Sequence, residues 1–134
     1  MRCTTFLRYI WALPDTAIGL LLCFPALVSG GKVRRVQGVL EITGRAAAWV
    51  LQCIPFSGPV TALTLGHVVL CADGETLAWW RSHELIHVRQ YERWGPFYIP
   101  AYLFSSLIAR LKGKDSYLDN RFEAEAFFYQ RKVT

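Results

Sequence analysis

The chain has few histidines, no paired cysteine motif and no internal repeat. It contains three histidines and four cysteines in 134 residues. The cysteines are far apart, form no C-x-x-C pair, and in three cases lie within apolar runs. This spacing is not that of a disulfide framework, and it indicates small buried hydrophobic residues in a reducing compartment.

Basic residues are numerous but dispersed. The 15 lysines and arginines outnumber the 10 acidic residues, which gives a formal net charge of +5. They are spread from Arg2 to Lys132, with Arg34 and Arg35 adjacent near Lys32. Because the sequence has no concentrated basic stripe with interleaved aromatic residues, it predicts no nucleic-acid partner.

The apolar content of the chain is sufficient for one domain. Hydrophobic residues make up 53% of the sequence, and a chain of this length is expected to bury one core rather than two. Composition divides it into an apolar N-terminal segment, residues 1–30, and a chemically richer domain, residues 31–134.

The N-terminal segment is open to three interpretations. In residues 5–29 the only charges are those of Arg8 and Asp15, and residues 17–28 have none. The segment is long enough to span a membrane if Asp15 and the neighbouring Pro14 are tolerated near one end. A break at Pro14 would instead give a shorter helix, capped by Asp15, that docks on the domain or lies in a membrane interface. A cleaved signal peptide is the third interpretation, although no A-x-A-like site follows the apolar run.

Local patterns predict strands and one short helix in the first part of the domain. Residues 32–44 alternate loosely between β-branched and polar residues, and Gly38 near their middle indicates two short strands or one bulged strand. Residues 45–54 predict a helix that ends before a connecting loop at residues 55–59. Residues 61–71 then predict a strand with Leu63, Leu65, His67 and Val69 on one side.

The stretch RSHELIH carries the clearest chemical signal in the chain. It places His83, Glu84 and His87 in the spacing H-E-x-x-H, on a predicted helix that begins near Asp73 and ends at Gly95-Pro96. At an i, i+4 spacing, two imidazoles project from one helix face, close enough to share a tetrahedral metal ion. Glu84 then leans over the site, where a base for the metal-bound water is needed. The inward face of this helix comprises Trp80, His83, Glu84, His87, Tyr91 and Trp94.

A zinc site needs a third protein ligand. No histidine follows His87, so the ligand is expected to be a carboxylate. Glu92 falls on the opposite face of the same helix, and the aspartates at 115 and 119 lie in a turn-like stretch. A helix predicted over residues 120–130 leaves two candidates, Glu123 and Glu125, which point to different sides. Asn120 and Glu123 also fit a capping box, which is a competing structural role for Glu123.

The motif and the downstream glutamate resemble the gluzincin branch of the zincin metallopeptidases, and especially the minimal gluzincin-like domains. In that family the third ligand commonly stands in E-x-x-A-D or E-x-x-A-N, and residues 123–126 match the first four positions. The fifth position of the pattern is Asp or Asn, and this chain has Phe127 there instead. The resemblance covers residues 60–130, and it favours Glu123 over Glu125 as the third ligand. It implies an α+β fold: a short antiparallel sheet, the H-E-x-x-H helix and a C-terminal ligand helix, preceded here by an apolar N-terminal helix.

The resemblance also implies an activity. His83, His87 and Glu123 would hold Zn²⁺, and Glu84 would act as general base for a zinc-bound water that attacks a peptide bond. An extended peptide or protein substrate would pair with the edge strand at residues 61–71. His67 on that strand would contact the substrate, or it would be a buried strand histidine with a purely structural role.

A second functional class stays open. The chain is small for an enzyme with two walls to its cleft, and a non-catalytic, membrane-associated zincin-like scaffold or interaction protein is the alternative. Residues 96–111 are apolar nearly all around, which indicates either a central packing helix or a face that rests on a membrane. The sequence leaves both a membrane-associated and a cytoplasmic location open.

Overall fold

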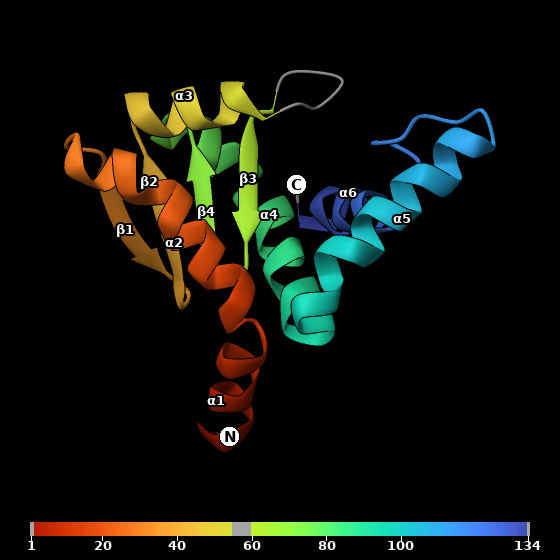
Figure 1. Cartoon of the computed structure of the whole chain (residues 1–134), viewed down its shortest axis with the longest axis horizontal. Coiled ribbons are helices and arrows are strands. Elements are labelled where there is room, and N and C mark those ends of the chain that lie inside the picture. Colours follow the sequence, from red (N-terminus) through yellow and green to blue (C-terminus); the bar gives the residue numbers. More distant parts are fainter. Residues whose placement is uncertain (1, 55–59, 134) are drawn as a thin grey trace.

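A four-stranded sheet lies at the centre of the fold, with helices against both of its faces (Figure 1). The computed structural model describes residues 2–54 and 60–133, so the loop expected at residues 55–59 lies outside the described residues. The α+β class predicted from the sequence is confirmed. The helices and strands are α1 (Arg2–Trp11), α2 (Leu13–Val28), β1 (Lys32–Val36), β2 (Val39–Thr43), α3 (Arg45–Cys53), β3 (Ala62–Leu65), β4 (Val68–Cys71), α4 (Gly74–Trp94), a 3₁₀ turn η1 (Gly95–Phe97), α5 (Tyr98–Leu111) and α6 (Arg121–Val133).

The sheet is mixed, and the prediction of an antiparallel sheet was wrong. Its strand order is β1-β2-β4-β3, in which β2 runs parallel to β4 and the other two neighbouring pairs are antiparallel. Parallel neighbours need a crossover connection, which is usually a helix. Here α3 follows β2, β3 at the outer edge of the sheet runs in the opposite direction to β2, and β4 returns between them parallel to β2.

The prediction of a single strand over residues 61–71 was also wrong. The chain reverses at Gly66 and His67, and the segment forms the two antiparallel strands β3 and β4. Gly66 has a φ of +59°, and a Cβ at this position would collide with Thr16. Only glycine combines this backbone conformation with so close a neighbour. His67 consequently lies in the turn and not on a strand face beside Leu63 and Leu65.

Two other local predictions are confirmed. Residues 32–44 form two strands, joined by a turn in which Gln37 and Gly38 both have positive φ, at 51° and 81°. Two consecutive residues of this kind make the tight turn that matches the twist of an antiparallel hairpin. The helix expected over residues 45–54 is α3, which ends at Cys53.

The two faces of the sheet bury different sets of helices. Alternate residues of β2 and β4, among them Ile42, Val68 and Leu70, pack against α2 and α3. The intervening residues, including Val39 and Val69, pack against α4. This alternation follows from the two-residue period of a strand. It holds the H-E-x-x-H helix rigidly along one face of the sheet.

A buried ion pair strengthens the contact between α4 and the sheet. Arg81 on α4 donates from Nε and Nη2 to the two carboxylate oxygens of Glu41 on β2, at 2.6 and 3.0 Å. Glu41 is buried, and Arg81 is partly exposed. A two-point pair of this kind fixes orientation as well as distance, so it sets the position of α4 two residues before His83.

The N-terminal segment forms two helices rather than one. The axes of α1 and α2 differ by 61° at a break around Ala12, close to the expected break at Pro14. No single helix within residues 2–54 and 60–133 is both long and apolar enough to cross a membrane, although this bent pair passes the same test when taken together. Cys23 and Ala26 of α2 belong to the core on the sheet. The second helix is therefore docked on the domain.

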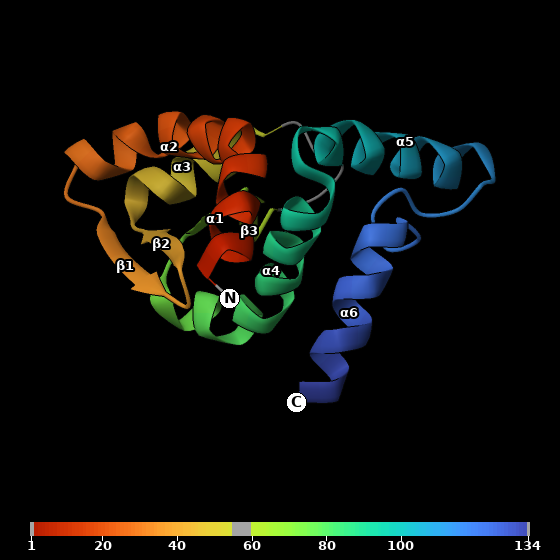
Figure 2. The same cartoon turned by 90° about the horizontal axis from the view of Figure 1, so that it is seen from below.

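The last three helices bring the chain back to α4. The motif helix α4 starts after Asp73, whose side chain accepts a hydrogen bond from the Thr76 backbone, and it ends at Gly95, as the sequence predicted. The polypeptide then turns through η1 into α5, and α6 returns to pack alongside α4. Figure 2 shows α2 and α5 along one side of the molecule, while α6 runs from that side to the opposite one.

Candidate metal centre

Three potential metal ligands converge in the interior between α4 and α6. His83 and His87 project from α4 and Glu123 from the first turn of α6, and all three side chains are buried. Nε2 of His83 lies 3.0 Å from Glu123 Oε2 and 3.1 Å from Nε2 of His87, which is in turn 3.4 Å from Glu123 Oε1. One possible ligand atom from each of the three residues lies within 4.8 Å of the other two. We refer to these residues as the triad.

The spacing of the triad suits a small tetrahedral cation. With metal–ligand bonds of about 2.0–2.1 Å, neighbouring corners of a coordination tetrahedron lie about 3.3 Å apart. The two imidazole nitrogens are 3.1 Å apart, and each lies 3.0 or 3.4 Å from one oxygen of the Glu123 carboxylate, which is close to that value. Two imidazoles and one carboxylate are the donor set of catalytic zinc sites that retain an open fourth position. The residues present thus fit a metal ion in both geometry and chemistry.

A glutamine determines which nitrogen of His87 is free for a metal. The amide nitrogen of Gln90 donates to the backbone oxygen of Phe122 and to Glu125, at 3.0 and 2.8 Å. Both partners are acceptors, so the amide oxygen must face the other way, where it lies 2.9 Å from Nδ1 of His87. Nδ1 of His87 is therefore the protonated nitrogen, and Nε2 points into the triad with its lone pair available.

His83 has a similar partner. Its Nδ1 lies 3.2 Å from the amide oxygen of Gln130, nearly two turns beyond Glu123 on the buried side of α6. The ring also packs edge-on against Trp80 and Phe127. Phe127, which departs from the gluzincin pattern, thus provides packing, while Gln130 supplies the hydrogen bond that orients the histidine.

Two tyrosines complete the polar shell. Tyr102 on α5 donates its hydroxyl proton to Glu123 Oε1 at 2.7 Å. Tyr98 donates to the amide oxygen of Gln90 at 2.8 Å and lies 3.1 Å from Nδ1 of His87. Burial raises the pKa of both tyrosines far above the ordinary value, so both hydroxyls keep their protons as hydrogen-bond donors. Helix α5 therefore braces the triad from a third side.

The electrostatics of the triad favour a positive charge at its centre. Burial alone would raise the pKa of Glu123, but hydrogen bonds with His83 and His87 outweigh it and hold the pKa well below its ordinary value. Burial likewise opposes charge on His87, yet its hydrogen bond and attraction to Glu123, with a contribution from Glu84, raise its pKa to about 9. The surroundings of the triad thus stabilise one positive charge, either a proton or a metal cation.

Glu84 is held beside the triad by the sheet. Its carboxylate accepts a hydrogen bond of 2.6 Å from the hydroxyl of Thr64 on the edge strand β3, and both side chains are buried. Its charge contributes to the raised pKa of His87, which places it within electrostatic range of the triad. Glu84 is hydrogen-bonded to Thr64, whereas Glu123 is hydrogen-bonded to His83 and Tyr102, so the two buried carboxylates have different partners.

The other sequence candidates lie apart from the triad. Glu125 accepts from Gln90 and pairs with Arg93 at 3.6 Å, so it supports the histidine shell and does not face the histidines. His67 contacts the far end of α4: its Nε2 lies 3.0 Å from Glu92, and its ring stacks on Tyr9 of α1. Its partners are structural ones, so the expected contact between His67 and a substrate at the triad has no support in this arrangement.

Asn120 resolves the competing role of Glu123. The Asn120 side-chain oxygen accepts the backbone N–H of Phe122 at 2.9 Å, and its amide nitrogen donates to Tyr102 O and Ser106 Oγ on α5. The side chain of Asn120 therefore caps α6, and Ser105 Oγ accepts the backbone N–H of Arg121, so the cap does not use Glu123. Glu123 is left free to turn towards the histidines.

Sequence reasoning did not identify the polar residues that surround the triad. Those residues are Thr64, Gln90, Tyr98, Tyr102 and Gln130. One signal was available for Gln90, because a glutamine three residues after His87 falls near the same helix face. The others come from separate elements, and only the fold brings them together.

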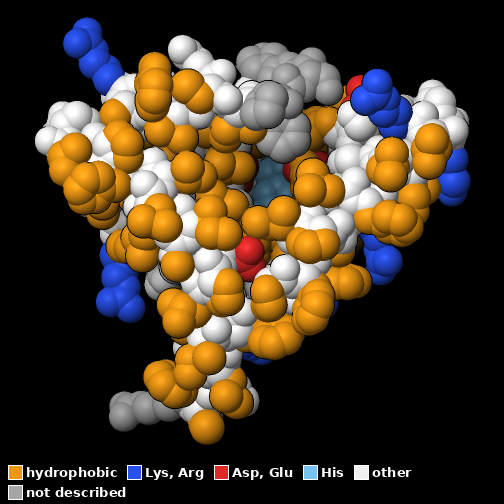
Figure 3. All heavy atoms as spheres, in the orientation of Figure 1, with side chains coloured by type: hydrophobic (Ala, Val, Ile, Leu, Met, Phe, Trp, Pro, Cys, Tyr) orange, Lys and Arg blue, Asp and Glu red, His pale blue; other side chains and the backbone are white. Residues whose placement is uncertain are grey.

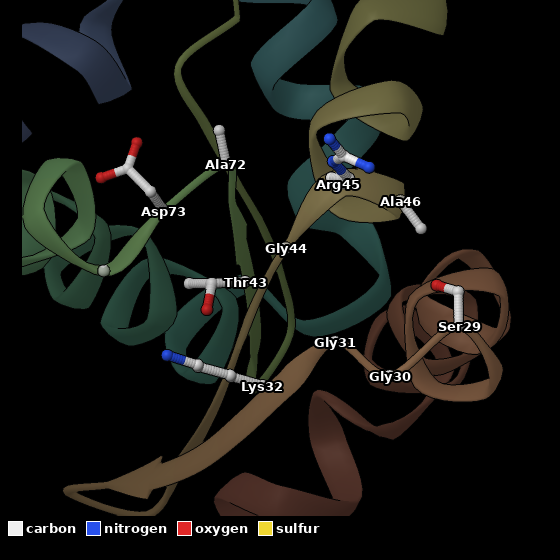
Figure 4. Close-up of a pocket in the computed structure, with 11 residues that line it drawn as sticks. Ser29, Gly30, Gly31, Lys32, Thr43, Gly44, Arg45, Ala46, Ala72 and Asp73 are labelled. Atoms are coloured by element: carbon white, nitrogen blue, oxygen red, sulfur yellow. The ribbon is translucent and has the colours of Figure 1, made fainter.

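A concavity lies where α2 leads into β1, β2 into α3 and β4 into α4, and no histidine lines it. It is bordered by glycine-rich backbone around Gly30 and Gly44 and by the side chains of Lys32, Arg45 and Asp73 (Figure 4). Asp73 is already engaged as the N-cap of α4. The concavity does not contain the triad, so it forms no part of the candidate centre.

Comparison of this chain with known proteins yielded no relative. No protein-family model, no curated protein and no solved structure matches it. The function must therefore be argued from the site itself.

Proposed function

We propose that the protein is a small zinc metallopeptidase of the gluzincin type, with His83, His87 and Glu123 as the metal ligands and Glu84 as the general base. The observation that carries this proposal is the convergence of two Nε2 atoms and one carboxylate, together with a second buried carboxylate, that of Glu84, which is held by Thr64. This pairing of a ligand set with a separate base is what hydrolysis needs. A purely structural metal site needs ligands but no general base, so it would not need a carboxylate at the position of Glu84.

The residues of this chain support each part of the reaction. A zinc ion in the triad would polarise a carbonyl group and lower the pKa of a bound water to about 7. Glu84 would accept a proton from the attacking water as the water oxygen bonds to the peptide carbonyl carbon, and would donate that proton to the nitrogen as the C–N bond breaks. Thr64 keeps the Glu84 carboxylate in one orientation, and Gln90 and Gln130 keep both imidazoles turned to the centre.

The edge strand β3 is the proposed place for an extended substrate. In the described residues β3 pairs only with β4, so its other edge is not paired with a strand. A peptide could add to that edge by backbone hydrogen bonding. It would then lie next to Thr64, whose side chain contacts Glu84.

One observation favours the alternative of a non-catalytic scaffold. The backbone oxygen of Thr64, a group that an added strand would use, already accepts the hydroxyl of Tyr91 at 3.1 Å. A peptide would have to displace this bond or pair only elsewhere along β3. If the displacement does not occur, the domain would bind its metal as a stable scaffold and serve as a membrane-associated assembly or interaction protein.

A matched pair of variants tests the metal site. Glu123→Gln and Glu125→Gln make the same change two residues apart on α6, but only Glu123 belongs to the triad. We expect about one zinc per chain in the wild type and in Glu125→Gln, and little in Glu123→Gln or His87→Ala. If folded wild-type protein takes up no zinc when it is offered, the proposal fails.

A third variant separates the enzyme from the scaffold. Glu84→Gln removes the base but leaves all three ligands in place, so zinc content should be unchanged while hydrolysis of a peptide library falls by about 10²–10⁴-fold. Equal activity in Glu84→Gln and wild type would exclude Glu84 as the base. Absence of activity in a zinc-loaded wild type would favour the scaffold.

A further inference from the structure

Helix α2 has the reverse of the usual packing arrangement. Its side towards the sheet carries small residues, Gly19, Cys23 and Ala26, and a Cβ at Gly19 would lie only 3.0 Å from atoms of Leu65 and Val68. The bulky apolar side chains, such as those of Leu21 and Phe24, point outwards and are 75% and 62% exposed. The only charged residue of α2, Asp15, is buried. A helix in contact with water shows the opposite distribution.

Helix α5 presents a second apolar surface on the same side of the molecule. Leu103, Phe104, Leu107 and Leu111 are all exposed, and the sole charge in this helix is Arg110 near its end. In Figure 2 α2 and α5 lie along one side, with the sheet, α4 and α6 beneath them. We call this surface, formed by the outward side chains of α2 and α5, the apolar face. Exposed apolar surface of this extent is rare on a monomeric soluble protein.

The interior of the molecule is visible from the apolar face. Figure 3 views this face directly and shows hydrophobic side chains across most of it, with a hollow between the part formed by α2 and β3 and the part formed by α5. A histidine side chain is visible at the floor of the hollow, with acidic side chains beside it. Tyr102 of α5 and Thr64 of β3, which contact Glu123 and Glu84, come from the two elements that border the hollow.

Basic residues stand at the borders of the apolar face. The chain leaves α2 into β1 with Lys32, Arg34 and Arg35 exposed, and it leaves α5 with Arg110, Lys112 and Lys114 exposed. Asp115 in the second of these turns is engaged with the backbone N–H groups of residues 117 and 118. Lys and Arg side chains are seen around the edge of the face in Figure 3. An apolar centre with a basic border suits the acyl chains and the anionic headgroups of a bilayer.

We propose that the apolar face lies in the surface of an anionic phospholipid bilayer, with the hollow between α2, β3 and α5 opening towards the lipid. A bilayer fits better than a second copy of the chain, because two copies in contact through this face would bring their basic borders together. The same border is attracted to anionic headgroups. The protein would lie on the membrane through α2 and α5 and not cross it.

The orientation restricts the substrate, and this step rests on the proposed function. A hollow that opens into the headgroup region receives a polypeptide segment that lies at the bilayer surface or emerges from it. Such a segment reaches the edge of β3 without crossing bulk water. The substrate class is accordingly a membrane-bound protein or a membrane-adsorbed peptide, not a freely soluble one.

Three matched phenylalanines test the face. Phe24 on α2, Phe104 on α5 and Phe128 on α6 are exposed to similar extents, 62%, 64% and 55%, but α6 does not form part of the apolar face. Binding is measured by co-flotation of detergent-free protein with vesicles of phosphatidylcholine and about 30% phosphatidylserine. We expect Phe24→Glu and Phe104→Glu to lower the partition coefficient at least about tenfold, and Phe128→Glu to change it less than about twofold.

Two further measurements test the proposal: vesicle binding at other lipid compositions and salt concentrations, and the oligomeric state of the protein. Binding should weaken in pure phosphatidylcholine and in high salt, since exposed charges are screened over about 3 Å at 1 M salt. The proposal would be overturned if wild-type protein did not co-float with the vesicles. It would also be overturned if the wild type formed a dimer that Phe24→Glu dissociates. Glu84→Gln should bind vesicles as the wild type does. Vesicle binding without any hydrolysis would support the membrane-binding face and overturn the peptidase proposal. Hydrolysis of soluble peptides without vesicle binding would support the peptidase and overturn the membrane-binding face.

Discussion

The amide oxygen of Gln90 lies 2.9 Å from Nδ1 of His87, one turn away on the same helix. This contact is imposed by the other end of the amide, which is held by Phe122 and Glu125 on α6. A single glutamine therefore joins α4 to α6 and determines which nitrogen of His87 carries the proton. The geometry of the candidate centre depends on residues that bind no metal themselves.

We expect Gln90→Leu to weaken zinc binding by about 10–100-fold, because loss of an outer-shell partner frees the ring orientation and the tautomer of a histidine ligand. Competition with a chromophoric chelator measures the affinity. Gln52→Leu is the control, since Gln52 is exposed on α3, away from the triad. An affinity of Gln90→Leu equal to that of the control would show that His87 is oriented without Gln90.

Removal of the metal should lower the thermal stability of the protein. A ligand that binds only the folded state at about 1,000 times its Kd adds about 4 kcal/mol, and for a domain of this size that corresponds to a Tm shift on the order of 10 °C. Melting with zinc and with a chelator should differ by this amount in the wild type and not in His83→Ala. Coincident curves in the wild type would mean that the triad holds no metal under those conditions.

Most of the helices, and the two histidines, could be predicted from local sequence. The start of the helix near Asp73, its stop at Gly95 and the i, i+4 spacing of His83 and His87 are all features of one segment, and the structure contains them as expected. The choice of Glu123 over Glu125 came from a family pattern, and the structure brings Glu123 alone to the histidines. The gluzincin assignment itself stays a prediction.

The features that sequence analysis missed depend on pairing between distant segments. The parallel pairing of β2 with β4 follows from the path of α3, and the turn at Gly66 follows from the approach of Thr16, fifty residues earlier in the chain. Gln130 contacts His83 only because α6 packs along α4. Periodicity and capping patterns contain no information on such contacts.

Replacement of Arg81 by leucine should destabilise the fold. The change leaves Glu41 buried without its ionic partner. Such breakage of a fully buried pair costs about 3–5 kcal/mol, and because Arg81 is partly exposed we expect about 2–3 kcal/mol. Urea denaturation measures the loss, and Glu41→Gln combined with Arg81→Leu should recover part of it. An unchanged midpoint for Arg81→Leu would show that the pair contributes nothing to stability.

Asp15 should make the protein less stable as the pH rises. Burial raises the pKa of its carboxyl group, and one oxygen has no hydrogen-bond partner among the described residues. The folded state then binds the proton more tightly than the unfolded state, whose Asp pKa is about 3.9. This contribution to stability is complete below that value and is lost as the pH rises through the higher folded pKa.

Asp15→Asn keeps the shape of the side chain and removes this titration. We expect its Tm to exceed that of the wild type at pH 7, and the two values to converge at about pH 3.5, where the unfolded carboxyl group is also largely protonated. The negative charge near the start of α2 is favourable to the helix dipole and acts in the opposite direction. A lower Tm for Asp15→Asn at pH 7 would mean that this dipole interaction outweighs desolvation.

Thr64 should affect catalysis without affecting metal content. Its hydroxyl donates to Glu84 at 2.6 Å, and no contact links it to a ligand of the triad within the described part of the chain. Thr64→Val has nearly the same shape but cannot donate, so Glu84 loses the bond that orients its carboxylate. Because proton transfer needs a correctly oriented carboxylate, kcat for peptide hydrolysis should fall about tenfold, with zinc content and KM little changed.

Thr64→Ser retains the hydroxyl and should recover most of the activity. Loss of activity in both variants would instead assign Thr64 to packing, because serine lacks only the methyl group, and full activity in Thr64→Val would show that the sheet does not position the base.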